Sequence, residues 1–262
     1  FETFITTLQS NGIVVTVIED SPVPHTPDAV FPNNWISFHD NAGICLYPMF
    51  AGNRRLERKR QVLDEIQKKF RVAQIIDLTG YEARNAFLEG TGSMVLDRDH
   101  AIAYACLSPR TDKNVLTVFC EKLHYQPVCF TASDTGNQPI YHTNVMMCVA
   151  DAYAVICLDS IQDSAERQMV MRKLTETGKQ IIEISIDQMN HYAGNMLQVH
   201  NAGGKTFLVM SSQAFRSLTA NQVQRIEAFN PIIHSDITTI ETNGGGSARC
   251  MIAEIFLPLI HQ

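Results

Sequence analysis

The sequence of 262 residues contains no apolar run that approaches the ~20 residues of a membrane-spanning helix. It also lacks an excess of basic residues, because 21 Lys and Arg stand against 27 Asp and Glu and the net charge is −6. Nucleic acids and anionic membrane surfaces select positively charged patches. We therefore expect neither a nucleic acid nor a membrane as a partner.

The sequence also lacks the cysteine arrangements that mark disulfide frameworks and zinc sites. Its seven cysteines are odd in number, scattered, and mostly lie in apolar, strand-like segments. It has no CxxC or HExxH spacing, and we expect no secretory signal peptide. These features predict a cytoplasmic, reducing location and no metal site.

One cysteine stands apart from the others, because Cys250 follows three consecutive glycines and is next to Arg249. Glycines bring main-chain N–H groups close to a bound group, and nearby cations favour the reactive thiolate. We predict that Cys250 is a nucleophile and that Gly245, Gly246 and Ser247 form its pocket floor and oxyanion contacts. The alternatives are a structural turn before a buried cysteine and a phosphate-binding loop, although the latter requires a lysine after the glycines.

A strand–turn–strand pattern recurs four times, with turns near residues 41, 99, 151 and 202. A helical pattern follows each hairpin, at 53–70, 111–123, 163–177 and 219–229. A short apolar strand follows each helix, at 73–76, 126–130, 180–184 and 231–233. A ββαβ unit that recurs every ~50 residues is typical of a radial array.

Residues 1–262 therefore predict a single α/β domain, a five-fold pseudosymmetric α/β propeller of ββαβ units. Residues 1–10 indicate the tail of a helix and residues 13–18 a strand, so we expect the first unit to lack its opening strand. The alternative is an α/β sandwich whose hairpins are similar by chance. In a propeller, loops at one end of the units converge on the axis, so residues far apart in sequence can share one pocket.

Three polar residues lie immediately before the first strand of a hairpin: Asn34, Glu89 and His142. Equivalent positions in repeated units lie on the same rim of the array. Taken singly, Glu89 is compatible with a turn cap and His142 with a buried core histidine. Taken together with Cys250, they predict a Cys–His–Glu catalytic arrangement.

Five ordered motifs carry a resemblance that covers nearly the whole sequence: PDAVFPNNW, LEGTGS, LSPRT, YHTN and NGGGSARC. With them the sequence resembles the guanidino-group-modifying enzymes, which include arginine deiminases, dimethylarginine dimethylaminohydrolases and glycine amidinotransferases. It is most similar to the bacterial citrulline-utilisation hydrolases, often described as amidinotransferase-like. These families share the pentein fold, so the resemblance implies the same five-fold propeller as the repeat.

The resemblance implies that Cys250 is the nucleophile, His142 the general acid and base, and Glu89 the acid that orients His142. It implies that Arg54 and Arg110 bind the α-carboxylate of the substrate. For either arginine the alternative is a surface salt bridge, and the basic cluster at 54–60 favours a solvated helix face. No organic cofactor or metal is implied.

The resemblance also implies a loop that holds the reacting end of the substrate. Asp28 matches an acid of the dimethylaminohydrolases, but Asn33 and Asn34 replace the two acids that close their loop, and Asn144 replaces an aspartate of the deiminases. A guanidinium has only donors and suits carboxylates, whereas a neutral ureido group offers both donors and a carbonyl acceptor. The three asparagines therefore favour citrulline or another ureido compound over arginine.

The sequence thus predicts a cysteine-dependent hydrolase that cleaves a C–N bond in the ureido or guanidino group of an amino acid. The expected partner is this small-molecule substrate, and a homodimer is among the quaternary states that the sequence allows. The main alternative is an amidinotransferase that passes the amidino group of arginine to an amine. A binding protein without catalysis is less compatible with a sequence that retains cysteine, histidine and glutamate.

Overall fold

The computed structural model describes residues 1–260, whose strands form four three-stranded sheets. The sheets are β1 (Ile36–Phe38), β2 (Gly43–Leu46) and β3 (Gln74–Asp77); β4 (Val95–Asp97), β5 (Ile102–Cys106) and β6 (Gln126–Phe130); β7 (Met147–Val149), β8 (Tyr153–Ile156) and β9 (Gln180–Glu183); β10 (Leu197–His200), β11 (Thr206–Ser211) and β12 (Ile232–Ser235). In each sheet the first two strands form an antiparallel hairpin, and the third pairs in parallel with the second.

A helix precedes the third strand of every sheet, which confirms the predicted ββαβ order. These helices are α2 (Arg60–Gln67), α4 (Lys113–Leu123), α6 (Ser164–Glu176) and α9 (Ala220–Glu227). Side-chain caps fix where three of them begin: Asp112 caps α4, Asp163 caps α6, and Thr219 opens α9 with a capping box.

The remaining helices are short or lie at the ends of the described chain. They are α1 (Glu2–Ser10), α3 (Gly90–Ser93), α5 (Thr143–Met146), α7 (Ile186–Asn190), α8 (Ser212–Ser217), α10 (Thr238–Gly244) and the 3-10 helices η1 (Pro32–Asn34), η2 (Gly52–Glu57), η3 (Thr79–Arg84) and η4 (Leu158–Ser160). None of the helices within residues 1–260 is both long and apolar enough to cross a membrane.

The core is continuous from one unit to the next. All five residues of β5 are buried, as expected for a strand with packed side chains on both faces. One apolar cluster joins Tyr47 of the first unit to Phe119 in α4 of the second, and another joins Tyr104 of the second unit to Tyr153 of the third. The sheets are therefore held against their neighbours and not only against their own helices.

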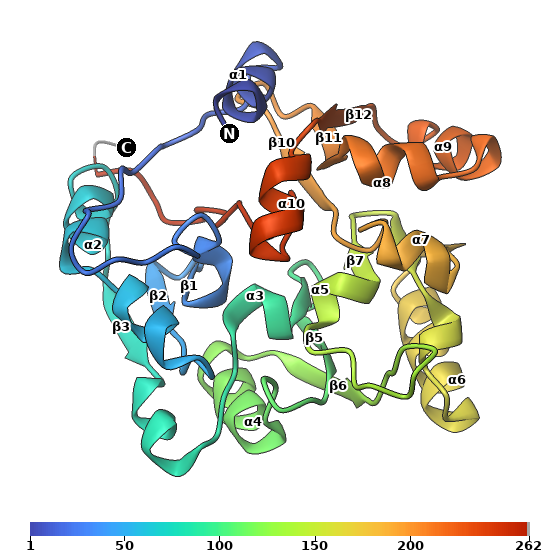
Figure 1. The fold of residues 1–262 in the computed structure, drawn as a ribbon, viewed down its shortest axis with the longest axis horizontal. Coiled ribbons are helices and arrows are strands. Elements are labelled where there is room, and N and C mark those ends of the chain that lie inside the picture. The colour runs from blue at the N-terminus through green and yellow to red at the C-terminus, as the bar shows by residue number, and fades with distance from the viewer. Residues whose placement is uncertain (261–262) are drawn as a thin grey trace.

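Figure 1 shows α2, α4, α6 and α9 at the periphery of the molecule and α3, α5 and α10 near its middle. α3 contacts both η1 and α5, although these elements are far apart in sequence. η1, α3 and α5 each directly precede the first strand of a sheet. The segments in which the sequence places its polar residues are therefore gathered near the centre.

Two local predictions are wrong. Residues 13–18 form no strand, because they have no hydrogen-bonded neighbouring strand within residues 1–260. Ile13 and Val15 still pack against the buried cluster that includes Phe4 and Leu8. The helical pattern at 53–70 divides into η2 and α2, because Arg58 and Lys59 leave the helical conformation.

Candidate active site

Glu89 and His142 form a buried pair at the centre of the molecule. Each immediately precedes a one-turn helix, α3 for Glu89 and α5 for His142, and each of these helices runs directly into the first strand of a sheet. The imidazole Nε2 of His142 lies 2.6 Å from Oε2 of Glu89, and Oε1 of Glu89 accepts the N–H of Phe50 at 2.9 Å. The predicted proximity of the two residues is thus present, and both carboxylate oxygens have hydrogen-bond partners.

The surroundings lower the pKa values of both Glu89 and His142. Burial favours the neutral form of Glu89, but the hydrogen bond to His142, the charge of His142 and the charge of Arg110 outweigh it and lower the pKa of Glu89 to about 2. Burial lowers the pKa of His142 below its usual value, and Glu89 opposes this effect. Glu89 is therefore a carboxylate at neutral pH and stabilises the imidazolium form of His142.

Arg110 lies on the outer side of this pair. Its guanidinium Nη1 is 3.4 Å from Oε2 of Glu89, and its side chain is about one-third exposed (32%). The guanidinium also lies over the rings of Phe50 and Tyr141, at 5.6 and 5.2 Å from their centroids. Arg110 is thus held close to the His142–Glu89 pair and keeps contact with solvent, which is compatible with binding a substrate carboxylate.

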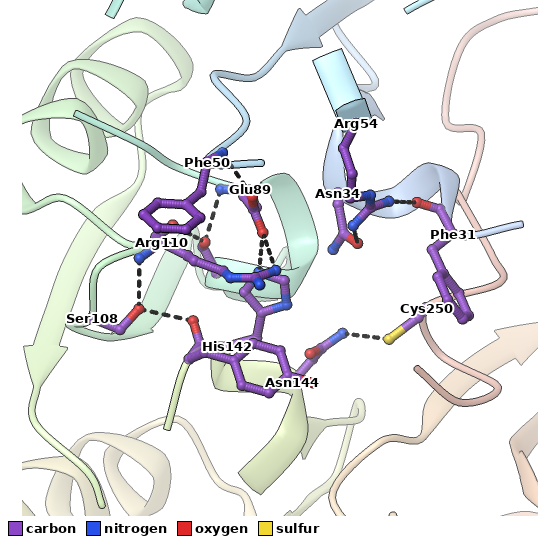
Figure 2. Close-up of polar contacts among 12 residues, drawn as sticks. Phe31, Asn34, Phe50, Arg54, Glu89, Ser108, Arg110, His142, Asn144 and Cys250 are labelled. Atoms are coloured by element: carbon purple, nitrogen blue, oxygen red, sulfur yellow. Dashed lines mark hydrogen bonds and ion pairs between the residues drawn. The ribbon is translucent and has the colours of Figure 1, made fainter. Parts of the chain in front are cut away.

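Cys250 is buried beside two carboxamides. Nδ2 of Asn144 lies 3.4 Å and Nδ2 of Asn195 3.2 Å from its sulfur. The sulfur thus accepts hydrogen bonds from two carboxamide N–H groups that come from different units of the chain. In the view of Figure 2, Asn144 lies between Cys250 and His142, and its carboxamide donates to the Cys250 sulfur.

Asn195 was not among the residues selected from the sequence. Its carboxamide also donates to the main-chain oxygen of Asn144 at 3.1 Å and accepts the N–H of Arg249 at 3.0 Å. A signal for it exists in the sequence, because Asn195 directly precedes the last apolar hairpin, as Asn34, Glu89 and His142 precede theirs. The rule that found the other three would have found it.

Arg54 is placed differently from its neighbours in the basic cluster. It is only 6% exposed, so the expectation of a solvated helix face is wrong for this residue. Its guanidinium makes two hydrogen bonds to Glu57, at 2.8 and 2.9 Å, one to Oδ1 of Asn34 at 2.7 Å and one to the carbonyl of Phe31 at 3.1 Å. These contacts direct the guanidinium at protein groups rather than at a substrate carboxylate.

Gly92 leaves room for two of the polar side chains. A Cβ on this residue would lie 2.3 Å from Nδ2 of Asn34 and 2.8 Å from Nδ1 of His142. A side chain at this position of α3 would therefore displace the Asn34 carboxamide, the His142 imidazole or both. Because Nε2 of His142 contacts Glu89, it is Nδ1 that lies on the side of Asn34 (Figure 2).

Several buried polar atoms near these groups have no hydrogen-bond partner within the described chain. They include both polar atoms of the Asn33 carboxamide, Nδ2 of Asn34 and Oδ1 of Asn144. Buried polar atoms are normally paired, so these atoms are available to hydrogen-bond a bound molecule. Asp28 is half-buried in the turn before η1, and its carbonyl lies 3.5 Å from Nη2 of Arg54.

The glycine-rich loop lies beside Phe31. A Cβ on Gly246 would lie 2.8 Å from the Phe31 ring, and Gly245 ends α10 with its carbonyl accepting the Tyr141 hydroxyl at 3.1 Å. Ser247 is buried and donates its hydroxyl to Glu241 at 2.6 Å. The N–H of Gly245 donates to the Glu241 carbonyl, so it is not free to stabilise an oxyanion.

Solved structures of hydrolases that modify the guanidino group have the same fold. ArgZ, an arginine dihydrolase from the ornithine–ammonia cycle in cyanobacteria, is 16% identical with a TM-score of 0.76 over 99% of this chain and 36% of its own. The N-terminal domain of ArgZ bound to substrate is 17% identical, with a TM-score of 0.73 over 98% of this chain and 86% of that one. A dimethylarginine dimethylaminohydrolase adduct with S-methyl-L-thiocitrulline is 15% identical, with a TM-score of 0.66 over 95% and 85%.

The sequence itself assigns the chain to a protein family, which is narrower than a shared fold. A family model described as N,N dimethylarginine dimethylhydrolase, eukaryotic, matches residues 1–257. The chain belongs to this family, a group of hydrolases that act on non-peptide C–N bonds, and its resemblance to the guanidino-group-modifying enzymes is thereby confirmed. No curated protein is similar enough in sequence to count as a relative. The chain spans about a third of the length of full-length ArgZ.

Proposed function

We propose that this protein hydrolyses a C–N bond in the ureido group of citrulline or a related amino acid, with Cys250 as the nucleophile. The observation that carries the proposal is the pair of carboxamide N–H donors on the Cys250 sulfur, next to the buried His142–Glu89 pair. A thiolate beside an oriented imidazole is the arrangement required for covalent catalysis.

In the proposed reaction the Cys250 thiolate adds to the central carbon of the ureido group. The C–N bond then breaks, the departing nitrogen takes a proton from the His142 imidazolium, and an S-linked carbamoyl intermediate remains. Neutral His142 next removes a proton from water, the hydroxide adds to the same carbon, and the C–S bond breaks to release the thiolate. Glu89 keeps the imidazole in place and stabilises its charged form in each half-reaction.

The preference for a ureido group rests on the unpaired carboxamide atoms. Nδ2 of Asn34 is a donor and Oδ1 of Asn144 is an acceptor, and a ureido group offers one partner of each kind. Carboxylates in these places would be buried against a neutral group, which costs several kcal/mol of desolvation. Arg110, at the solvent edge of the site, would bind the α-carboxylate of the amino acid.

We further propose that the chain forms one catalytic domain of five pseudosymmetric units. The support is a regular interval: Asn34, Glu89, His142, Asn195 and Cys250 follow one another at 53 to 55 residues along the sequence. The first four each lie directly before the first hairpin strand of a sheet or its one-turn helix. A fifth unit would combine α1, residues 13–18 and the chain after Cys250, which all contribute side chains to one apolar cluster or its border.

The test is to incubate the purified protein with citrulline, arginine and methylated arginines and to measure the ammonia and amine released. Ammonia from citrulline, in the absence of an amine acceptor, is expected. Cys250→Ser should lower kcat by orders of magnitude with an unchanged circular dichroism spectrum. Turnover that requires an added amine would support an amidinotransferase, and near-full activity of the serine variant would exclude Cys250 as the nucleophile.

A further inference from the structure

The contacts of Arg54 fix the orientation of a neighbouring carboxamide. A guanidinium has five N–H donors and no acceptor, so any atom that it contacts at hydrogen-bond distance must be an acceptor. Nη1 of Arg54 lies 2.7 Å from the Asn34 carboxamide. The atom at this contact is therefore the oxygen of Asn34, and its NH₂ group must point the other way.

The other side of that carboxamide faces the reacting groups. Nδ2 of Asn34 lies 2.3 Å from the position that a Cβ on Gly92 would take, and Nδ1 of His142 lies 2.8 Å from the same position. This nitrogen is buried and has no acceptor within residues 1–260. Figure 2 shows it on the side of Asn34 that faces away from Arg54.

We propose that Arg54 is a positioning residue that fixes Asn34 as a hydrogen-bond donor and thereby selects substrates with a carbonyl oxygen at the reacting carbon. A guanidinium offers only donors to Asn34 Nδ2 and leaves it unpaired, whereas a ureido oxygen accepts from it. This inference rests on the proposed function. It replaces the carboxylate-binding role that the resemblance implies for Arg54.

Glu57 explains why the guanidinium stays in this orientation. It accepts from Nε and Nη2 of Arg54 at 2.8 and 2.9 Å, and its side chain is 1% exposed. The Phe31 carbonyl accepts from Nη2 as well, so Nη1 is left directed at Asn34. Because the guanidinium is planar and is fixed at Nε and Nη2, its Nη1 has little freedom to point away from Asn34.

The experiment compares two substitutions at residue 54 by the ratio of kcat/KM for L-citrulline to kcat/KM for L-arginine. Arg54→Lys still presents only donors to Asn34 and should retain the ratio within about threefold. Arg54→Gln combined with Glu57→Gln removes both buried charges. The glutamine amide at residue 54 can donate or accept a hydrogen bond, so the Asn34 carboxamide can rotate and exchange the positions of its oxygen and nitrogen. The ratio should then fall by roughly tenfold or more, the effect of losing one buried hydrogen bond.

Equal ratios in the lysine and glutamine variants, with thermal unfolding midpoints close to that of the unchanged protein, would overturn the proposal. A measurement on the unchanged protein covers the case in which the double variant fails to fold. The side-chain amide protons of Asn34 should show a strong nuclear Overhauser effect to the Hα protons of Gly92. If this effect is absent, Nδ2 points elsewhere and the proposal is wrong.

The two readouts separate this inference from the proposed function. If neither amino acid is hydrolysed, the proposed function fails, and the Overhauser effect still tests the orientation: it should be strong in the unchanged protein and weaker in the double glutamine variant if Arg54 orients Asn34. If the effect is present but arginine is the better substrate, the orientation holds and the selection of a carbonyl oxygen is refuted. If citrulline is hydrolysed and the ratio is unchanged in the double variant, the proposed enzyme activity is supported, but Arg54 has no role in substrate selection.

Discussion

Substituting Asn195 tests whether carboxamides hold Cys250 as a thiolate. Asn195→Leu removes one of the two N–H donors at the sulfur. A hydrogen bond to a charged group contributes about 1.5–3 kcal/mol, so the rate at which Cys250 is alkylated should fall by roughly 10- to 150-fold. Asn195→Asp retains the oxygen that accepts from the N–H of Arg249 but directs a carboxylate at the sulfur.

The aspartate variant should show the larger effect. Two negative charges separated by the present 3.2 Å repel by ~5 kcal/mol at an effective dielectric constant of about 20. That value is an upper limit, because the introduced carboxylate can take up a proton instead. We therefore expect the rate of Cys250 alkylation at pH 7 to decrease from the unchanged protein to Asn195→Leu and further to Asn195→Asp.

The assay is alkylation by iodoacetamide, with mass spectrometry to locate the label on each cysteine. Half-buried Cys129 is an internal control, because partial unfolding would accelerate its alkylation in the same sample. Slower labelling of Cys250 with a constant rate at Cys129 is the expected result. Labelling of Cys250 at the original rate in both variants would refute the role assigned to the Asn195 carboxamide.

Other substitutions test the remaining groups of the site. Asn34→Asp together with Asn144→Asp should shift kcat/KM toward arginine, because carboxylates pair with a guanidinium; an unchanged preference would count against ureido selection. Glu89→Gln removes the group that raises the pKa of His142, so this pKa should fall further below its usual value. The imidazolium then exists only at lower pH, and the alkaline decline of kcat should begin at lower pH. A pH profile that superimposes on that of the unchanged protein would exclude His142 as the acid.

Much of the fold could be predicted because the signals are local. Alternation of apolar residues and polar turns gave the hairpins, and a recurring spacing gave the ββαβ units. The same equivalence of positions selected Glu89 and His142, whose side chains meet although they are 53 residues apart. It works because each residue opens a one-turn helix that leads into a buried strand.

The errors have a different physical origin. The role of Arg54 depends on the groups that surround its guanidinium. Its contact with Glu57 forms within η2, but its contacts with Asn34 and Phe31 arise only when η1 and η2 pack together. Residues 13–18 have the composition of a strand, but a strand also requires a hydrogen-bonded neighbour. The orientation of a carboxamide is likewise absent from sequence patterns, because it depends on one contact atom.

The attachment of Glu89 and His142 to one-turn helices that continue into buried strands has a consequence for turnover. Side chains on mobile loops must be ordered each time a substrate binds, and this loss of conformational entropy raises the free energy of the reaction's transition state. Here the backbone that carries the proposed acid–base pair, Glu89 and His142, is ordered when the sheets pack, before any substrate binds. The conformational entropy of this backbone is therefore lost when the protein folds, and it need not be lost again each time a substrate binds.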